Sequence, residues 1–283
     1  MNQSSMNEDL MQAEGLLVQG ETDLAESLLS RMAADAEEYV AANCPTTEHV
    51  QWFSFPTLFE RLAYRRVEND PRELREMDEP LDRMYSDLGL ACVRQGDYAR
   101  ATEALKQAVR WNPMDCAHRL NLADLFRTNG DIDEWLGLSF SVFERASDAR
   151  HLARAFANFS EYYLVQQKPR TAAAALRAGR RLGAREHALD QALDQATGTT
   201  HDPDLVGDDE ARDLLAQEGL PEGANAEIAV CMLMCASDAA KTGHRDLATD
   251  LTVRARDLVG GPAATALIEL IHNTDEAADD AQA

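Results

Sequence analysis

A recurring spacing of small residues constrains the fold of this 283-residue chain more than any other feature. In each copy a small residue is followed seven positions later by a glycine, and five positions after that by an alanine. The copies are Ala13-Gly20-Ala25, Gly89-Gly96-Ala101 and Ala236-Gly243-Ala248, with Ser160-Gln167-Ala172 as a variant that carries glutamine in the middle. Such a spacing, within units of about 34 residues, is typical of stacked helical hairpins.

Each position of this spacing has a physical role in a helical hairpin. The first and last residues lie where two antiparallel helices cross, and short side chains there let the helix axes approach to about 8–9 Å. The middle residue takes the left-handed conformation that ends the first helix, which glycine adopts at low steric cost. The acidic residues that follow it, Glu21, Asp97 and Asp131, are suited to the positive end of the second helix. Because one hairpin cannot bury its apolar stripe, the pattern predicts a stack of pairs.

The segment MYSDLGLACVRQGDYARATEALKQAVRWNPMD, residues 84–115, resembles a tetratricopeptide repeat. The small and helix-breaking positions of that family are occupied by Gly89, Gly96, Ala101, Ala108 and Pro113. Two of its aromatic positions hold Cys92 and Leu105 instead. A second copy follows directly, and there Trp135 stands where a small residue is usual, so its second helix should pack less closely.

The resemblance covers residues 6–39, 82–187 and 229–262. It implies an all-α fold, a right-handed superhelical solenoid of antiparallel helix pairs. Six segments are expected: an N-terminal hairpin at 1–45, a divergent aromatic-rich helical hairpin at 46–81, a central array at 82–195, a linker loop at 196–210, C-terminal helices with a cap at 211–274, and a disordered acidic tail at 275–283.

The aromatic-rich segment allows two interpretations. Apolar side chains from Trp52 to Val67 recur at helical spacing, with Pro56 near the start. They could pack inside the fold or anchor a partner as an aromatic patch. Core packing is favoured, because apolar residues at helical spacing are usually buried.

Charge and composition restrict the class of partner. The net charge of −23 argues against general affinity for nucleic acid or anionic lipid. No stretch of the sequence is apolar enough to span a membrane, and the N-terminus lacks the basic start of a secretory signal. Five scattered cysteines fit a reducing compartment, so we expect a cytoplasmic protein. Residues 145–186 reverse the charge, with three acids and nine bases. This basic island is either a solvated arginine-rich face or a preference for an acidic ligand.

No catalytic or metal-binding motif stands out. P-loop, GxGxxG, HExxH and GxSxG sequences are missing. Cys231 and Cys235 lie one helical turn apart, but two thiols without further partners do not make a zinc site, and buried structural cysteines are the favoured interpretation. The sequence therefore predicts no enzyme activity, no metal and no cofactor.

The candidate binding residues follow from the resemblance. Asn121 and Asn158 occupy a position that faces the concave groove in that family, where an amide both donates to and accepts from a peptide backbone. The alternative is that both are simply exposed helix residues. Together with their expected neighbours the groove residues are Arg83, Asp87, Asn121, Asp124, Arg127, Arg154, Asn158 and Glu161.

A grip on terminal carboxylates, as in the chaperone-binding members of the family, is not predicted. Asn121 and Arg154 match two of the positions that make such a grip. Ser86, Leu90 and Asn158 stand where its other residues should be. The sequence thus predicts a non-catalytic scaffold or adaptor that binds a protein or an extended peptide. The alternative is a regulatory sensor whose superhelix changes shape when a peptide binds.

Overall fold

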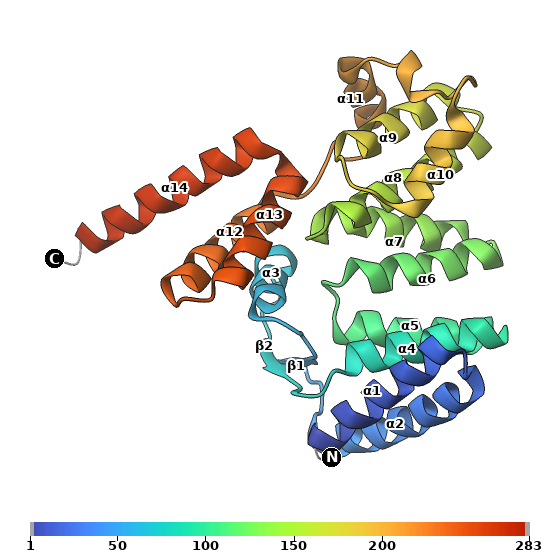
Figure 1. Ribbon diagram of the computed structural model, residues 1–283, viewed down its shortest axis with the longest axis vertical. Helices are drawn as coiled ribbons and strands as arrows, with labels where there is room; N and C mark the ends of the chain where they lie inside the picture. Colours follow the sequence, from blue (N-terminus) through green and yellow to red (C-terminus); the bar gives the residue numbers. More distant parts are fainter. Residues whose placement is uncertain (1–2, 281–283) are drawn as a thin grey trace. The chain divides into compact units, whose positions relative to one another are not determined.

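The computed structural model describes residues 3–280. Over these residues it contains fourteen α-helices, one short 3-10 helix and two short strands (Figure 1). The chain divides into two compact units, unit 1 at Met1–Trp135 and unit 2 at Leu136–Ala283, and each is described by itself. The expected all-α fold of antiparallel helix pairs is confirmed.

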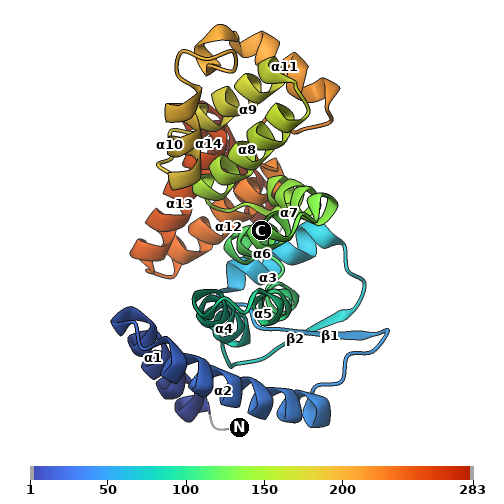
Figure 2. The same cartoon turned by 90° about the vertical axis from the view of Figure 1, so that its right-hand side faces the viewer.

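Each copy of the repeat spacing folds as one pair of packed helices. The pairs are α1 (Gln3–Gln19) with α2 (Thr22–Asn43), α4 (Leu81–Gln95) with α5 (Tyr98–Trp111), α8 (Ala149–Val165) with α9 (Pro169–Arg181), and α12 (Ala226–Lys241) with α13 (Arg245–Val259). In unit 1, α2 packs on α4 and α5 packs on α6 (Cys116–Asn129), so consecutive pairs stack. Figure 2 shows α1 and α2 as such a pair.

The turn between the helices of each pair has the predicted backbone. Gly20, Gly96 and Gly243 adopt positive φ values of 83°, 79° and 84°. Gln167, the predicted substitute for glycine, also has a positive φ of 57°. A non-glycine residue in this region is uncommon, so the spacing located these four helix ends correctly.

The close helix crossing is most evident at Gly89. A β-carbon placed on Gly89 would lie 2.9 Å from Cγ of Leu105 on α5. Ala101, the partner position in the spacing, is fully buried. The small residue is therefore required by the approach of the two helices.

Residues 46–81 form a strand–helix–strand unit, and the prediction of a helical hairpin is wrong. The strands β1 (Val50–Phe53) and β2 (Glu73–Glu76) pair in parallel, with Val50 opposite Glu73, and α3 (Leu58–Glu68) connects them. The β1 sequence VQWF is rich in β-branched and aromatic residues, which favour extended backbone. Pro56 and the Thr57 capping box then delay the helix until Leu58.

The aromatic residues of this unit pack mainly inside it. Phe53 and Phe59 are buried, and the rings of Phe53 and Phe55 stack with their centroids 4.9 Å apart. Ser54 is tied to α5 by its backbone N–H, which donates to the carbonyl of Trp111. Core packing is therefore the correct interpretation for Phe53 and Phe59.

The division between the units falls inside α7 (Ile132–Arg145), directly after Trp135. This is the residue whose size departs from the repeat pattern. In unit 2, Phe143 of α7 meets Phe156 of α8 edge to face, with ring centroids 4.9 Å apart. Phe143 also lies near Phe159, with ring centroids 6.1 Å apart, so aromatic side chains join α7 to α8.

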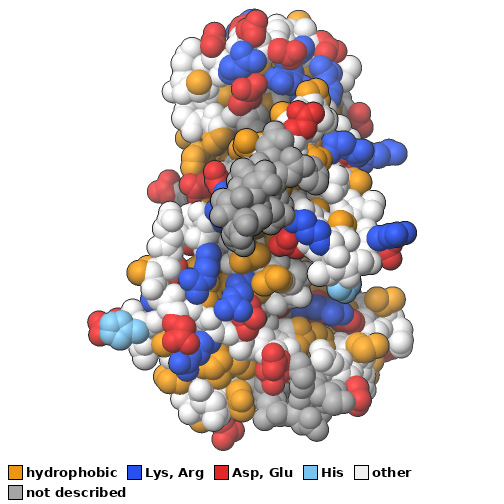
Figure 3. Space-filling model, turned by 90° about the vertical axis from the view of Figure 1, so that its left-hand side faces the viewer, with side chains coloured by type: hydrophobic (Ala, Val, Ile, Leu, Met, Phe, Trp, Pro, Cys, Tyr) orange, Lys and Arg blue, Asp and Glu red, His pale blue; other side chains and the backbone are white. Residues whose placement is uncertain are grey.

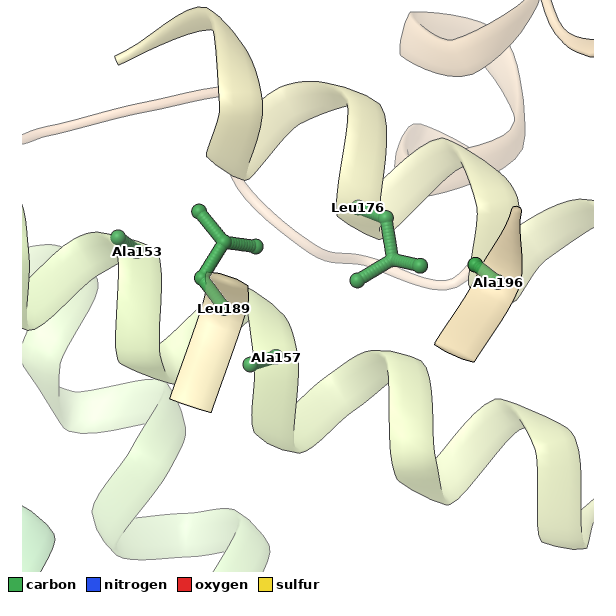
Figure 4. Close-up of a cluster of buried hydrophobic side chains, with 5 residues drawn as sticks. All are labelled: Ala153, Ala157, Leu176, Leu189 and Ala196. Carbon is green, nitrogen blue, oxygen red and sulfur yellow. The ribbon is translucent and has the colours of Figure 1, made fainter. Parts of the chain in front are cut away.

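Around α8 and α9, unit 2 builds a compact cluster with α10 (His187–Ala196). Leu189 and Ala196 of α10 lie against Ala153 and Ala157 of α8 and Leu176 of α9, and all five are buried (Figure 4). Beyond α10 come a 3-10 turn at Pro203–Leu205 and α11 (Asp208–Gln217).

The boundary predicted after residue 210 needs correction. The 3-10 turn and α11 both pack on α9, so α11 belongs with the preceding helices and not with the C-terminal ones. The contacts of α11 include ion pairs with Arg170 and Arg177 of α9, a feature that periodicity does not reveal. The C-terminal helices begin only at Ala226, after a connection at 218–225.

The last helix, α14 (Gly261–Asp280), packs on α12 and α13, in the region where the sequence predicts a cap. It is longer than the sequence predicts and continues to Asp280, into the segment expected to be a disordered tail. Residues 281–283 of that tail lie outside the described part of the chain. Within the described residues, none of the helices is long and apolar enough to cross a membrane.

Candidate functional site

A cleft of about 280 Å³ lies between α4 and α6 in unit 1. We call it the α4–α6 cleft. Its polar lining comes from Ser86, Asp87, Asn121 and Asp124, and its apolar lining includes Leu90 and Leu105. Three of the predicted groove residues, Asp87, Asn121 and Asp124, are therefore brought together here by consecutive repeats.

Asp87 is the most perturbed acid of the α4–α6 cleft. Burial raises the pKa of its carboxyl group, the nearby Glu14 carboxylate raises it further, and the pKa reaches about 6. The Arg83 guanidinium lowers the pKa of Asp87, but its effect is smaller than those of burial and of Glu14. Among the described residues, Oδ2 of Asp87 is buried and has no hydrogen-bond partner. A buried acceptor without a donor is costly, so it favours a ligand that supplies one.

Asn121 and Asp124 stand on the opposite wall, one helical turn apart on α6. Asn121 is exposed and Asp124 is half-buried. An exposed amide next to carboxylates can both donate to and accept from a peptide unit. Leu90 on α4 is also exposed, which adds an apolar contact at the edge of the cleft.

Arg83 and Arg127 lie near the cleft but contact other elements. Arg83 is exposed on α4 and forms an ion pair with Glu14 of α1. Arg127 is exposed on α6, with its guanidinium carbon 6.0 Å from the centre of the Trp135 ring. Neither residue lines the cleft. Arg83 acts on it through the charge that it places near Asp87.

The other three predicted residues, Arg154, Asn158 and Glu161, lie on α8 in unit 2. Asn158 is only 4% exposed, and its Nδ2 donates to Oγ of the buried Ser139 on α7 at 2.9 Å. Its amide therefore bonds within the helix packing and does not face an open groove. The reason is that α8 is buried on several faces, with Phe156 and Phe159 on either side of Asn158 also inside.

The basic island is largely paired within unit 2. Basic side chains of α9 and of its N-terminal turn form ion pairs with acids of residues 204–222. The pairs are Lys168–Glu218, Arg170–Glu210, Arg177–Asp208, Arg180–Asp204 and Arg181–Glu222. Figure 3 shows basic and acidic side chains interspersed at the upper end of the molecule, where α9 and α11 lie. An acidic segment of the chain itself thus pairs with most of the basic face, for which the sequence left a solvated face and an acidic ligand as alternatives.

A buried polar cluster in unit 1 was not anticipated. Nε2 of His118 lies 3.5 Å from Oδ2 of Asp115 and 3.8 Å from Oδ2 of Asp82. Nδ2 of Asn112 donates to the same Asp82 oxygen at 3.1 Å and to Oε1 of Glu60 at 3.3 Å. These residues come from α3, α4, α6 and the α5–α6 turn, so the cluster joins the strand–helix–strand unit to the repeats. Repeat spacing carries no signal for such long-range pairing.

Burial has opposite effects on the two kinds of group in this cluster. Burial raises the pKa of Glu60, against the hydrogen bonds from Asn112 and Thr57. Burial lowers the pKa of His118, but the carboxylates of Asp82 and Asp115 outweigh it and leave that pKa raised. Asp82, Asn112 and His118 are buried, whereas Glu60 and Asp115 are half-buried.

The cysteines take no part in these sites. Cys231 is buried on α12, as predicted, and Cys235 is half-buried. A hydrogen bond from Cys231 lowers the pKa of Cys235. No group of three or more histidine, cysteine or acidic side chains in the described part of the chain is arranged to hold a metal ion.

No protein-family model matches the chain, and no curated protein matches it. A solved structure from a functional characterization of Pseudomonas aeruginosa pilF is similar, with a TM-score of 0.46 and 15% sequence identity. The alignment covers 96% of this chain and 98% of that chain. Similarity at this level carries no argument about function.

Proposed function

We propose that this chain is a non-catalytic scaffold or adaptor that binds an extended segment of a partner protein in the α4–α6 cleft. The observation that carries the proposal is the convergence of Asp87, Asn121 and Asp124, from two consecutive repeats, on one hollow beside the exposed Leu90. Stacked helix pairs provide rigid walls for such a cleft.

The charge of the cleft favours a basic side chain in the ligand. Asp87 and Asp124 are acidic, and Glu14 lies close to Asp87. A lysine or arginine from a partner would give the buried Oδ2 of Asp87 the donor it lacks, and would offset the repulsion between carboxylates. The exposed amide of Asn121 would bond the peptide backbone of the same segment.

The test is selection from a random peptide library displayed on phage, with the purified full chain as target. The expected result is enrichment of peptides with a lysine or arginine beside an apolar residue. The Asp87→Asn and Asn121→Ala variants should each bind the selected peptides with about tenfold lower affinity, the equivalent of one or two lost hydrogen bonds. Asp35→Asn, which removes an exposed carboxylate of α2, is the matched control. Selected peptides that bind the Asp87 and Asn121 variants as tightly as the unmodified chain would refute the cleft assignment.

A peptide-responsive sensor is the second candidate. The observation that favours it is the division of the chain into two compact units at Trp135, since a sensor needs parts that can respond separately. Small-angle scattering of the full chain with and without a selected peptide separates the two functions. A scaffold keeps the same scattering curve, whereas a sensor shows a changed radius of gyration.

A further inference from the structure

A second cleft, of about 520 Å³, lies within unit 2. Its walls come from three segments that are distant in sequence: the start of α8 at 148–150, the turn after α9 at 182–185, and α13 at 254–257. We call it the arginine cleft, because these segments contribute Arg150, Arg185, Arg254 and Arg256. Asp148 and Asp257 are the acids among the residues that line it.

The lining is positive although the chain is strongly acidic. Four arginines and two aspartates line the cleft, and Asp250 pairs with Arg254 from outside this lining, so the group carries an excess of one positive charge in a protein with a net charge of −23. Opposite charges are normally spread over such a surface, so a local excess raises the concentration of anions at this place. Guanidinium groups also match the planar geometry of carboxylates, to which they donate two parallel hydrogen bonds.

Three of the guanidinium groups are held in place by the protein. Nε and Nη2 of Arg254 donate to the carbonyl and the hydroxyl of Ser147 at 3.0 and 2.7 Å. Nη1 of Arg254 also donates to Oδ2 of Asp250 at 3.3 Å, so this guanidinium is both oriented by Ser147 and paired with a carboxylate. Arg150 is fixed by Asp148 at 2.5 Å, and Arg256 by Asp257 at 2.7 Å. Side chains that are already ordered lose little entropy when a ligand binds.

Arg185 differs from the other three. It is exposed in the turn between α9 and α10, and makes no hydrogen bond or ion pair with any residue whose side chain the structure describes. Most basic side chains of the neighbouring α9 are paired with acids of α11 and its flanks. Arg185 therefore retains a charge that a ligand can use.

We propose that the arginine cleft binds an acidic peptide segment of a partner protein through at least two of its carboxylates. A volume of 520 Å³ is far larger than one carboxylate or phosphate group, so a ligand that fills the cleft carries further atoms, as adjacent acidic residues do. The same unit shows this mode of recognition internally, because α9 receives the acidic segment around α11 through arginine–carboxylate pairs. The site is separate from the α4–α6 cleft and does not depend on the function proposed there.

The test uses fluorescence anisotropy of a fluorescein-labelled hexaglutamate peptide titrated with the full chain at low ionic strength. The expected result is saturable binding that Arg185→Glu weakens at least about tenfold, through loss of one charge and repulsion by another. Arg65→Glu makes the same charge change at an exposed position of α3 and should alter binding less than about twofold. Arg185 is exposed, so circular dichroism should show both variants folded.

Other outcomes overturn the proposal. No binding of hexaglutamate, or equal weakening by Arg185→Glu and Arg65→Glu, would show that the cleft has no specific affinity for acidic peptides. Inorganic phosphate that binds in a competing titration while hexaglutamate does not would assign the cleft to a small anion instead. Asp35→Asn, which removes an exposed carboxylate that lines neither cleft, should leave hexaglutamate binding unchanged.

Discussion

The side-chain amide of Asn158 donates a 2.9 Å hydrogen bond to the hydroxyl of Ser139, and both side chains are buried. The bond joins α8 to α7 inside unit 2. Asn158 therefore stabilises the packing of two helices, whereas its position in the repeat predicted contact with a ligand. A buried polar pair of this kind costs free energy when one member is removed, because the other is left without a partner.

Replacing Asn158 by alanine should destabilise unit 2. We expect Asn158→Ala to lower the free energy of unfolding by about 1–3 kcal/mol, the cost of leaving the Ser139 hydroxyl unpaired. Asn121→Ala, at the exposed equivalent in unit 1, should change it by less than about 0.5 kcal/mol. Urea unfolding followed by circular dichroism measures both. Equal effects at the two positions would contradict the burial that distinguishes them.

The close approach of α4 and α5 at Gly89 gives a second prediction. A methyl group there would lie 2.9 Å from Cγ of Leu105, so Gly89→Ala should destabilise unit 1 by about 1–3 kcal/mol through overpacking. Gly15→Ala is the matched control, because Gly15 lies in helix α1 with open space around its α-carbon. It should be neutral or stabilising by up to about 1 kcal/mol, as alanine favours helix over glycine. Thermal unfolding of both variants provides the measurement.

The helix pairs could be predicted because their determinants are local. Gly96 and Gln167 lie at helix ends because of their own backbone conformation. Gly89 lies where α4 crosses α5, the next helix in the sequence. Such information lies within about 34 residues and repeats, which makes it visible in one sequence.

What the sequence could not show depends on distant partners. The strand β1 forms only because β2 lies beside it, 23 residues later, and the apolar spacing of this segment fits a helix as well. Asn158 and Asn121 look equivalent in the repeat, yet α8 is buried on more faces than α6. The arginines of α9 meet acids 24 to 41 residues away, so the sequence alone left a solvated face and an acidic ligand as its two interpretations and did not show the internal pairing.

The raised pKa of Asp87 predicts a specific pH dependence. Its pKa is about 6 in the folded chain and about 3.9 when unfolded, so the folded state holds the proton more tightly. The stabilisation is complete below about pH 4 and is lost as the pH rises through about 6. Asp87→Asn should therefore raise the free energy of unfolding at pH 7, by about 1–2 kcal/mol once partial solvent exposure is considered.

Unfolding measured from pH 3.5 to 7.5 tests the role of Asp87, with Asp35→Asn as the control that removes an exposed carboxylate of α2. The difference in free energy of unfolding between the Asp87→Asn variant and the unmodified chain should shrink as the pH falls toward 4. An advantage that is constant over this range would show that Asp87 titrates normally.

The charged contact between α9 and α11 should control how firmly α11 is held. Each ion pair is exposed and contributes about 0–1 kcal/mol, so several pairs must act together. We expect the double variant Arg170→Ala/Arg177→Ala, which removes the pairs to Glu210 and Asp208 of α11, to speed hydrogen exchange of the amides of α11 by about tenfold, through easier local opening. Added salt should raise the exchange rate of α11 in the unmodified chain toward the rate in the variant, because salt screens the ion pairs. Exchange in α12 is the internal control, and unchanged exchange in α11 would show that apolar contacts alone hold it.

His118 gives a prediction for the alkaline side. Burial lowers its pKa, but Asp82 and Asp115 outweigh burial and raise it above its ordinary value of 6.5. The folded state therefore favours the charged imidazole. Its contribution to stability is complete below about pH 6.5 and is lost as the pH rises through the folded pKa. The His118→Gln variant has no imidazole to deprotonate. Above pH 6.5 the free energy of unfolding of this variant should therefore fall less with rising pH than that of the unmodified chain.

The matched control is His49→Gln, because His49 is fully open to solvent beside Glu48 and lies in the same unit. That variant should keep the pH dependence of the unmodified chain. The window of His118 overlaps the upper part of the range in which Asp87 titrates, so the two effects are separated by comparing the Asp87 and His118 variants with each other in one series of unfolding curves. If His118→Gln and His49→Gln give the same slope above pH 6.5, the two carboxylates do not hold a proton on His118, and the cluster stabilises unit 1 through the Asn112 hydrogen bonds to Asp82 and Glu60 instead.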